Sequence, residues 1–271
     1  QAVFFGDGGI TTLGANCFNM AIIGSFVAFL VYRAIAGRQA LTSSRRVVAA
    51  AVAGYIAINA SALCAAIELG IQPLFFKDGA GAPLYAPYPL SIAVPAMMIG
   101  HLTFAGFAEL VVSGGVVAYL QRTNPSLLKH TAPGALAGSE ATRTVMARGG
   151  WKTTRPLWVA TALLLVLTPL GIRAAGTAWG EWAARDFTNP AIRLKIAAAS
   201  GNVAPPAQAP RGLRRLSSMW VAPFPRYAPP LVRRPAFGYM LSAMFGAGII
   251  ILLSLMIGWL TSRKRWEETP G

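Results

Sequence analysis

The stretch VVAAAVAGYIAINASALCAAI, residues 47–67, decides the fold class because it contains no charged side chain. A second uncharged run extends from Pro235 to Ser262. The hydrocarbon core of a bilayer is about 30 Å thick, so a helix needs roughly 20 apolar residues, each rising about 1.5 Å, to cross it. Both runs are therefore long enough to span a membrane as helices.

The composition of the whole chain agrees with a membrane protein. Its 271 residues have a mean hydropathy of +0.52 and only 12% charged side chains, which argues against a soluble fold. We predict an all-α, polytopic transmembrane helix bundle. Five spans are expected, at about 13–36, 47–69, 90–120, 156–175 and 238–260. The third is too long for one straight crossing, so a kinked, tilted or re-entrant helix is expected there.

The basic residues, which give a net charge of +15, lie in the connections between the apolar runs. They do not alternate with aromatic residues on a polar domain, so we expect the lipid bilayer, and not nucleic acid, as the partner. The connection after the first span, with Arg45 and Arg46, is predicted to be cytoplasmic. The connection with Lys77 and Asp78 is predicted to be external.

Three parts are predicted along the chain: a membrane core of about four spans at 1–175, an external loop rich in Pro, Ala and Arg at 176–237, and a C-terminal transmembrane helix with a basic tail at 238–271. The loop is expected to be mostly extended, with one short amphipathic piece near residues 179–187. Small residues recur every four positions at 49–65 and at 238–246, which indicates helix packing faces.

Ionisable groups inside a membrane are costly, so His101 and Glu109 in the third span, and Glu68 at the outer end of the second, are functional candidates. His101 and Glu109 are separated by about two helical turns and cannot ligate one ion without a break in the helix. The alternative interpretation is that each is a structural group, hydrogen-bonded inside the bundle. Cys17 and Cys64 are read as small buried apolar residues and not as a disulfide or a metal pair.

Motifs of soluble catalysis are missing from the sequence. The GDGG turn at 6–9 lacks the lysine and the strand-to-helix context of a phosphate-binding loop, and the chain has no serine nucleophile elbow and no HExxH. A metal site needs converging donors, and the only other histidine, His130, is predicted on the opposite side of the membrane from His101. We therefore predict no enzyme, no catalytic residues and no cofactor or metal ligands within these residues.

Several segments resemble the CbiM and NikM family, the substrate-capture membrane subunits of energy-coupling-factor transporters for cobalt and nickel. FFGDGGITTLGANCFNM, residues 4–20, is similar to the family segment FGDGGLTALGANxxNM, and AMMIGHLTFAGFAELVVSGGVVAYLQRTNPSLL, residues 96–128, looks like the family's helix from histidine to glutamate. Residues 168–186, 215–230 and 238–253 look like the extension of longer members. The resemblance covers most of the chain.

The resemblance implies uptake of cobalt or nickel ions across the cell (inner) membrane, linked to cobalamin synthesis or nickel enzymes. It implies as partners a transmembrane coupling subunit, ATPase subunits and a small accessory membrane subunit. It also implies that the metal is held by a Met-His amino terminus and a Gly-His-Leu segment upstream of the DGG block. The chain is therefore expected to be the C-terminal portion of such a subunit, without those ligands.

Asp7, Asn16 and Asn19 would then lie beside the metal site and orient its ligands by hydrogen bonds. The alternative is that Asn16 or Thr12 only caps the first helical turn. A competing function is an ion channel or membrane-embedded enzyme that uses His101 and Glu109. The upstream sequence would discriminate between the two functions, whereas the choice between cobalt and nickel depends on ligands outside this chain.

Overall fold

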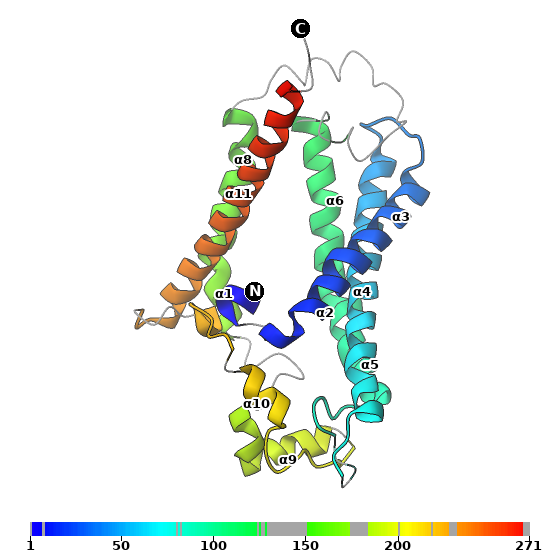
Figure 1. Cartoon of the computed structure of the whole chain (residues 1–271). Coiled ribbons are helices and arrows are strands. Elements are labelled where there is room, and N and C mark those ends of the chain that lie inside the picture. The colour runs from blue at the N-terminus through cyan, green and yellow to red at the C-terminus, as the bar shows by residue number, and fades with distance from the viewer. Residues whose placement is uncertain are drawn as a thin grey trace. The chain divides into compact units, whose positions relative to one another are not determined.

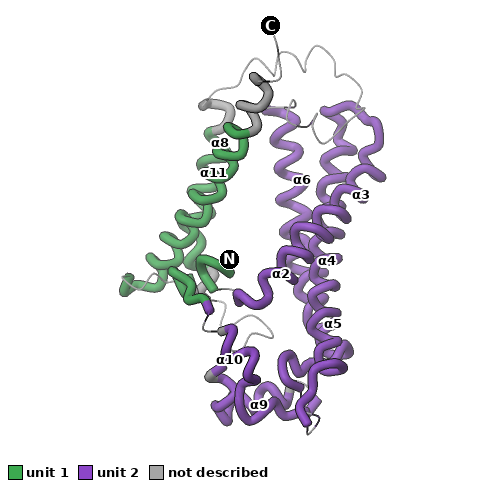
Figure 2. Tube along the Cα trace, viewed as in Figure 1, with its two compact units in different colours: residues 1–7, 155–178, 220–271 green, residues 8–154, 179–219 purple. Residues whose placement is uncertain are grey.

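The computed structural model of the chain describes residues 2–6, 9–79, 81, 83–123, 125, 128, 151–173, 184–199, 201–217, 219–227 and 232–267. These residues form helices and connections without a β-strand, which confirms the all-α prediction. The chain divides into two compact units (Figure 2). The larger contains residues 8–154 and 179–219, and the smaller contains residues 1–7, 155–178 and 220–271.

The larger unit is built around one long helix, α4 (Ser44–Phe75). Against it pack α3 (Ser25–Ala36), α5 (Leu90–Gly100) and α6 (Gly106–Thr123), as Figure 1 shows. Two π-helical segments also contact α4, namely η2 (Phe18–Gly24), which leads into α3, and η3 (His101–Ala105), which joins α5 to α6. Before η2 the chain forms η1 (Ile10–Thr12) and α2 (Leu13–Cys17).

Within the described residues, four helical stretches are long and apolar enough to cross a membrane: Ile10–Ala36, Ser44–Phe75, Leu90–Thr123 and Pro235–Leu260. They correspond to four of the five predicted spans. The apolar helix at the fourth predicted span, Arg155–Leu170, is shorter. The third predicted span is helical from Leu90 to Thr123 and contains the π-helix η3 from His101 to Ala105. Whether it is kinked, tilted or re-entrant in a membrane stays a prediction.

Small residues let the backbones approach α4 closely. A Cβ at Gly24 would lie 2.7 Å from Ser61 Oγ, and one at Gly70 would lie 2.9 Å from Leu90 Cα, so neither glycine can carry a side chain without a shift. Ala49, Ala53 and Ala57 on α4 are buried. The predicted packing face of this helix is confirmed within the chain.

The turn between α3 and α4 is held by a buried arginine. Arg46 is 1% exposed, and its guanidinium donates to Gln39 O (2.6 Å), Ala40 O (3.0 Å) and Tyr32 OH (3.1 Å). The arginine thus satisfies backbone carbonyls of the turn that have no helical partner. The side chain is a structural part of the loop and is not exposed to lipid headgroups.

Within 176–237, the described residues contain more helix than the sequence suggested. Most of the amphipathic piece expected near 179–187 lies outside the described residues. The 3₁₀-helix η6 (Ala184–Thr188), α9 (Pro190–Ala199) and α10 (Arg211–Ser217) belong to the larger unit, so the expectation of a mostly extended loop is wrong here. Phe187 and Ile196 are 1% exposed, and Arg193 donates to Phe187 O and to the carbonyls of the Pro205–Pro206 pair. Two buried apolar side chains and the hydrogen bonds of one arginine therefore stabilise a segment whose composition predicts little regular structure.

The smaller unit joins the amino-terminal residues to the carboxy-terminal part of the chain. It contains α1 (Ala2–Phe5), most of α8 (Trp151–Leu167), η5 (Thr168–Arg173), η7 (Pro225–Tyr227) and α11 (Pro235–Glu267). Helix α11 contacts η5 and η7, and η7 also contacts α1. The three-part division predicted along the sequence stays a prediction, since the two units are assembled from segments far apart in the chain.

Candidate functional site

The π-helix η2 places Asn19 against α4. The side chain is 3% exposed, and its Nδ2 donates a 2.8 Å hydrogen bond to Glu68 Oε2. The backbone of the same residue is also held, because Ser61 Oγ donates to Asn19 O at 2.8 Å. Two residues of α4, Ser61 and Glu68, thus fix one residue of the first span from two directions.

Local geometry explains why Asn19 needs these partners. A π-helix widens the turn, so some carbonyls lose their α-helical donor, and such segments are rare and concentrated at functional sites. In η2 the hydroxyl of Ser61 supplies a donor to the carbonyl of Asn19. The seven-residue π-helix is therefore stabilised by tertiary contacts with α4 and not by propensity alone.

The amide oxygen of Asn19 differs from its amide nitrogen in having no such partner. Asn19 Oδ1 is buried and has no hydrogen-bond partner among the described residues. A buried acceptor without a partner costs about 1–3 kcal/mol, so such atoms usually accept a bond from a bound group or water. Since Nδ2 is held by Glu68, the amide cannot rotate freely, and Oδ1 has a fixed direction.

The other two residues predicted beside the site differ in their placement. Asn16 lies inside α2, half-buried, and donates from Nδ2 to Thr12 Oγ1 at 3.4 Å. Thr12 is the N-cap of α2 but makes no side-chain cap bond, so the capping alternative is wrong for both residues. Asp7 lies outside the described residues.

His101 and Glu109 are not brought together by hydrogen bonds. His101 Nδ1 lies 2.8 Å from Met97 O, and Glu109 Oε1 accepts from Ser113 Oγ at 2.5 Å. Each ionisable group has a partner one turn away in its own stretch of helix, and the helix stays continuous between them through η3. The structure favours the structural interpretation of these two residues.

Sequence reasoning missed the partner of Asn19 and a second buried carboxamide. The sequence indicated Glu68 as an ionisable group at the end of the second span, but not as the hydrogen-bond partner of Asn19. The available signal was that Asn19, another polar side chain, lies near the start of the first span. Asn59 is 8% exposed, donates from Nδ2 to Tyr55 O at 2.7 Å, and also has a buried Oδ1 without a partner in the described part of the chain. Tyr55 OH in turn donates to Leu102 O in η3.

Possible metal ligands, the two cysteines and one surface hollow were the other candidates for a site. Across the described ranges, no three His, Cys, Asp or Glu residues are close enough to hold a metal ion. Both cysteines are free thiols, and Cys17 is exposed on its helix, contrary to the prediction that it is buried.

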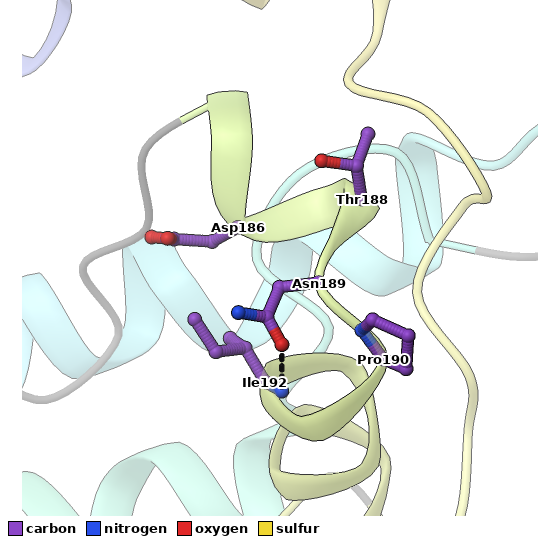
Figure 3. Close-up of a pocket in the computed structure, with 5 residues that line it drawn as sticks. All are labelled: Asp186, Thr188, Asn189, Pro190 and Ile192. Carbon is purple, nitrogen blue, oxygen red and sulfur yellow. Dashed lines mark hydrogen bonds between the residues drawn. The ribbon is translucent and has the colours of Figure 1, made fainter.

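The open hollow lined by Asp186, Thr188, Asn189, Pro190 and Ile192 (Figure 3) surrounds the start of α9. Asn189 Oδ1 there accepts from the backbone N–H groups of residues 191 and 192, as a helix cap does.

Comparisons with known proteins divide the chain into two matched parts. Residues 1–127 match the CbiM family, described as the cobalt uptake substrate-specific transmembrane region, and residues 154–263 match the PDGLE domain.

Two curated relatives span both parts. The fused nickel transport protein NikMN of Rhodobacter capsulatus is 53% identical over 252 residues, which cover 93% of this chain and 68% of that protein. The probable fused nickel transport protein LarMN of Lactiplantibacillus plantarum is 36% identical over 255 residues, covering 93% and 67%. A crystal structure of a transition metal transporter is 54% identical and covers 43% of this chain and 50% of its own, with a TM-score of 0.40.

Proposed function

The chain belongs to the CbiM and NikM family of transport proteins, and from this premise we propose that it is the membrane subunit through which a cell takes up nickel or cobalt ions. It acts as a transport subunit and not as an enzyme. The observation that carries the proposal is the 53% identity to a fused nickel transport protein along 93% of the chain. The four long apolar helices among the described residues supply the multi-pass membrane body that such a role requires.

Asn19 has a specific part in this function. Its buried amide is aligned by Glu68 and leaves Oδ1 as an acceptor without a protein partner among the described residues. Such an oxygen can accept the N–H of a metal-ligating imidazole and fix the orientation of the ring, which commonly changes metal affinity or activity by about 10–100-fold. Asn16 and Asp7, in the segment that leads to η2, would complete the polar surroundings of the same ligands.

Energy for uptake comes from outside this chain. We expect ATPase subunits and a transmembrane coupling subunit as partners in the inner membrane, with a small accessory membrane subunit as a further component. These partners follow from the family resemblance. Co-purification of tagged protein from membranes, followed by identification of the bound chains, would test them.

Metal accumulation tests the function directly. The full-length protein, expressed with its coupling and ATPase subunits in cells that lack nickel and cobalt uptake, should raise cell-associated radioactive nickel or cobalt above that of cells without it. A matched control is the same system with an ATPase subunit that cannot hydrolyse ATP. Equal accumulation in all three would contradict the proposal.

The competing function makes a different prediction in the same assay. If His101 and Glu109 formed the pathway of a channel, replacing both with Gln would abolish ion movement. Because each already has a partner in its own helix, we expect His101→Gln and Glu109→Gln to change uptake by less than about threefold, within the small effect of a single intramembrane hydrogen bond.

A further inference from the structure

The four residues of α1 end in a cluster of aromatic rings within the smaller unit. The aromatic cluster consists of Phe4, Phe5, Phe224, Tyr227, Tyr239 and Phe245. Phe5 stacks on Tyr227 at 4.8 Å between ring centroids, and Phe4 meets Phe245 edge-on at 5.4 Å. Phe224 meets Phe245 at 4.8 Å. Offset and edge-to-face geometries at these distances are the favourable ones for aromatic pairs.

Backbone hydrogen bonds accompany the ring contacts. Trp220 Nε1 donates to Val3 O at 2.6 Å, and the N–H of Phe224 donates to Phe4 O at 2.9 Å. A helix of only four residues leaves its carbonyls without intrahelical donors. Residues 220–224 supply donors to two of them, so the short helix depends on this distant segment for its hydrogen bonds.

Steric fit also points to one specific arrangement. Gly6 follows α1 with φ +73°, and a Cβ at this position would lie 3.3 Å from Ala222 Cβ. In the carboxy-terminal segment that contacts α1, Ser242 is 2% exposed. Its hydroxyl donates to Tyr227 O at 2.9 Å and so connects α11 to η7. The two parts of this surface, residues 220–227 and 235–246, are thus held together by a buried hydrogen bond.

Aromatic ring contacts together with hydrogen bonds to main-chain carbonyls can hold a short segment on a protein surface. We propose that residues 220–227 and 235–246, in the part that matches the PDGLE domain, form a docking surface whose ligand is the segment Ala2–Gly6 of the CbiM-matching part. By holding this segment, the surface restrains the residues that directly precede the DGG block in the sequence. The PDGLE-matching part is then a positioning element for uptake, an inference that rests on the proposed function.

The test measures docking separately from transport. In full-length protein with Cys17 and Cys64 replaced by Ser, a cysteine introduced by Ala2→Cys reports the contact, because the Ala2 side chain is 6% exposed in the docked state. A maleimide should label this cysteine slowly. Phe224→Ala removes two ring pairs and should speed labelling about tenfold, whereas Phe224→Tyr keeps the ring and should label like the parent.

Two further variants separate docking from unfolding. Trp220→Phe removes only the indole N–H donor and should speed labelling about threefold. Phe237→Ala deletes the same side chain as Phe224→Ala at a position on α11 that is 54% exposed, and should leave the rate unchanged. If neither Phe224→Ala nor Trp220→Phe speeds labelling, the docking surface is refuted.

Nickel uptake by the same variants tests the positioning role. Faster labelling together with lower uptake per protein molecule supports it, and faster labelling with uptake like that of the parent overturns it. If the parent itself takes up neither metal, the proposed function fails, while the labelling rates still decide whether the segment docks.

Discussion

Replacing Asn19 with Ala should lower uptake much more than it lowers stability. The change removes the amide that Glu68 holds at 2.8 Å, but the backbone carbonyl bound by Ser61 is retained. A hydrogen bond between membrane helices contributes about 0.6 kcal/mol on average and up to about 1.7 kcal/mol. Removing the orphaned Oδ1 relieves a burial cost of about 1–3 kcal/mol.

These two contributions have opposite signs and similar sizes, so the free energy of unfolding should change by no more than about 1 kcal/mol. For a chain of this size that corresponds to a shift in Tm of about 2–4 °C. Uptake of nickel or cobalt should nevertheless fall about tenfold or more, because the acceptor for the ligand imidazole is lost. Thermal unfolding in detergent and initial uptake rates in cells, normalised to the amount of membrane protein, measure the two effects.

A matched control is available within α4. Asn59 is also buried, and its Oδ1 also has no hydrogen-bond partner among the described residues, but its Nδ2 donates to the backbone carbonyl of Tyr55 and not to Glu68. Asn59→Ala should therefore change stability by a similar amount and leave uptake near that of the parent. The reasoning is refuted if Asn19→Ala transports like the parent, or if the two variants lose uptake equally.

Three other predictions concern the rest of the molecule. Arg46→Ala should lower the free energy of unfolding by about 3 kcal/mol because several charge-assisted hydrogen bonds are lost together. Arg46→Lys should recover only part of this loss when both variants are measured by thermal unfolding. A Tm of Arg46→Ala equal to that of the parent would show that the turn does not need the guanidinium. The 271-residue chain by itself should not bind nickel or cobalt with submicromolar affinity, since no group of three ligating side chains occurs among its described residues; tight binding in calorimetry after removal of any tag would contradict this. In a background without native cysteines, an impermeant maleimide added outside should label a cysteine at position 78 and not one at position 45; the reverse pattern would invert the topology.

The sequence alone predicted the fold class and the positions of the long helices. Partition of a segment into lipid depends on the summed hydropathy of consecutive residues, and this sum can be read along the chain, as in residues 47–67. It also indicated that the third span is too long for one straight crossing, and the structure has the π-helix η3 within that stretch. The resemblance around the DGG block, which the CbiM match over residues 1–127 confirms, added the function class.

Composition was a poor guide where a few tertiary contacts outweigh local preference. Residues 190–199 and 211–217 are helical although they lie in a segment rich in Pro and Ala. In this segment the side chains of Phe187 and Ile196 are buried, and Arg193 donates to a proline carbonyl. Likewise, nothing in the first residues of the chain indicates that Phe4 and Phe5 will pack beside Phe224 and Phe245.

The pairing of Asn19 with Glu68, 49 residues apart, was decided only by tertiary structure. Hydropathy places both residues near a span end, but it does not determine how each helix is rotated about its own axis. That rotation is about 100° per residue in an α-helix, and the π-helix η2 changes it by widening the turn just where Asn19 lies. The sequence therefore determined that these polar side chains would be in the membrane, and the packing of η2 on α4 determined that they would meet.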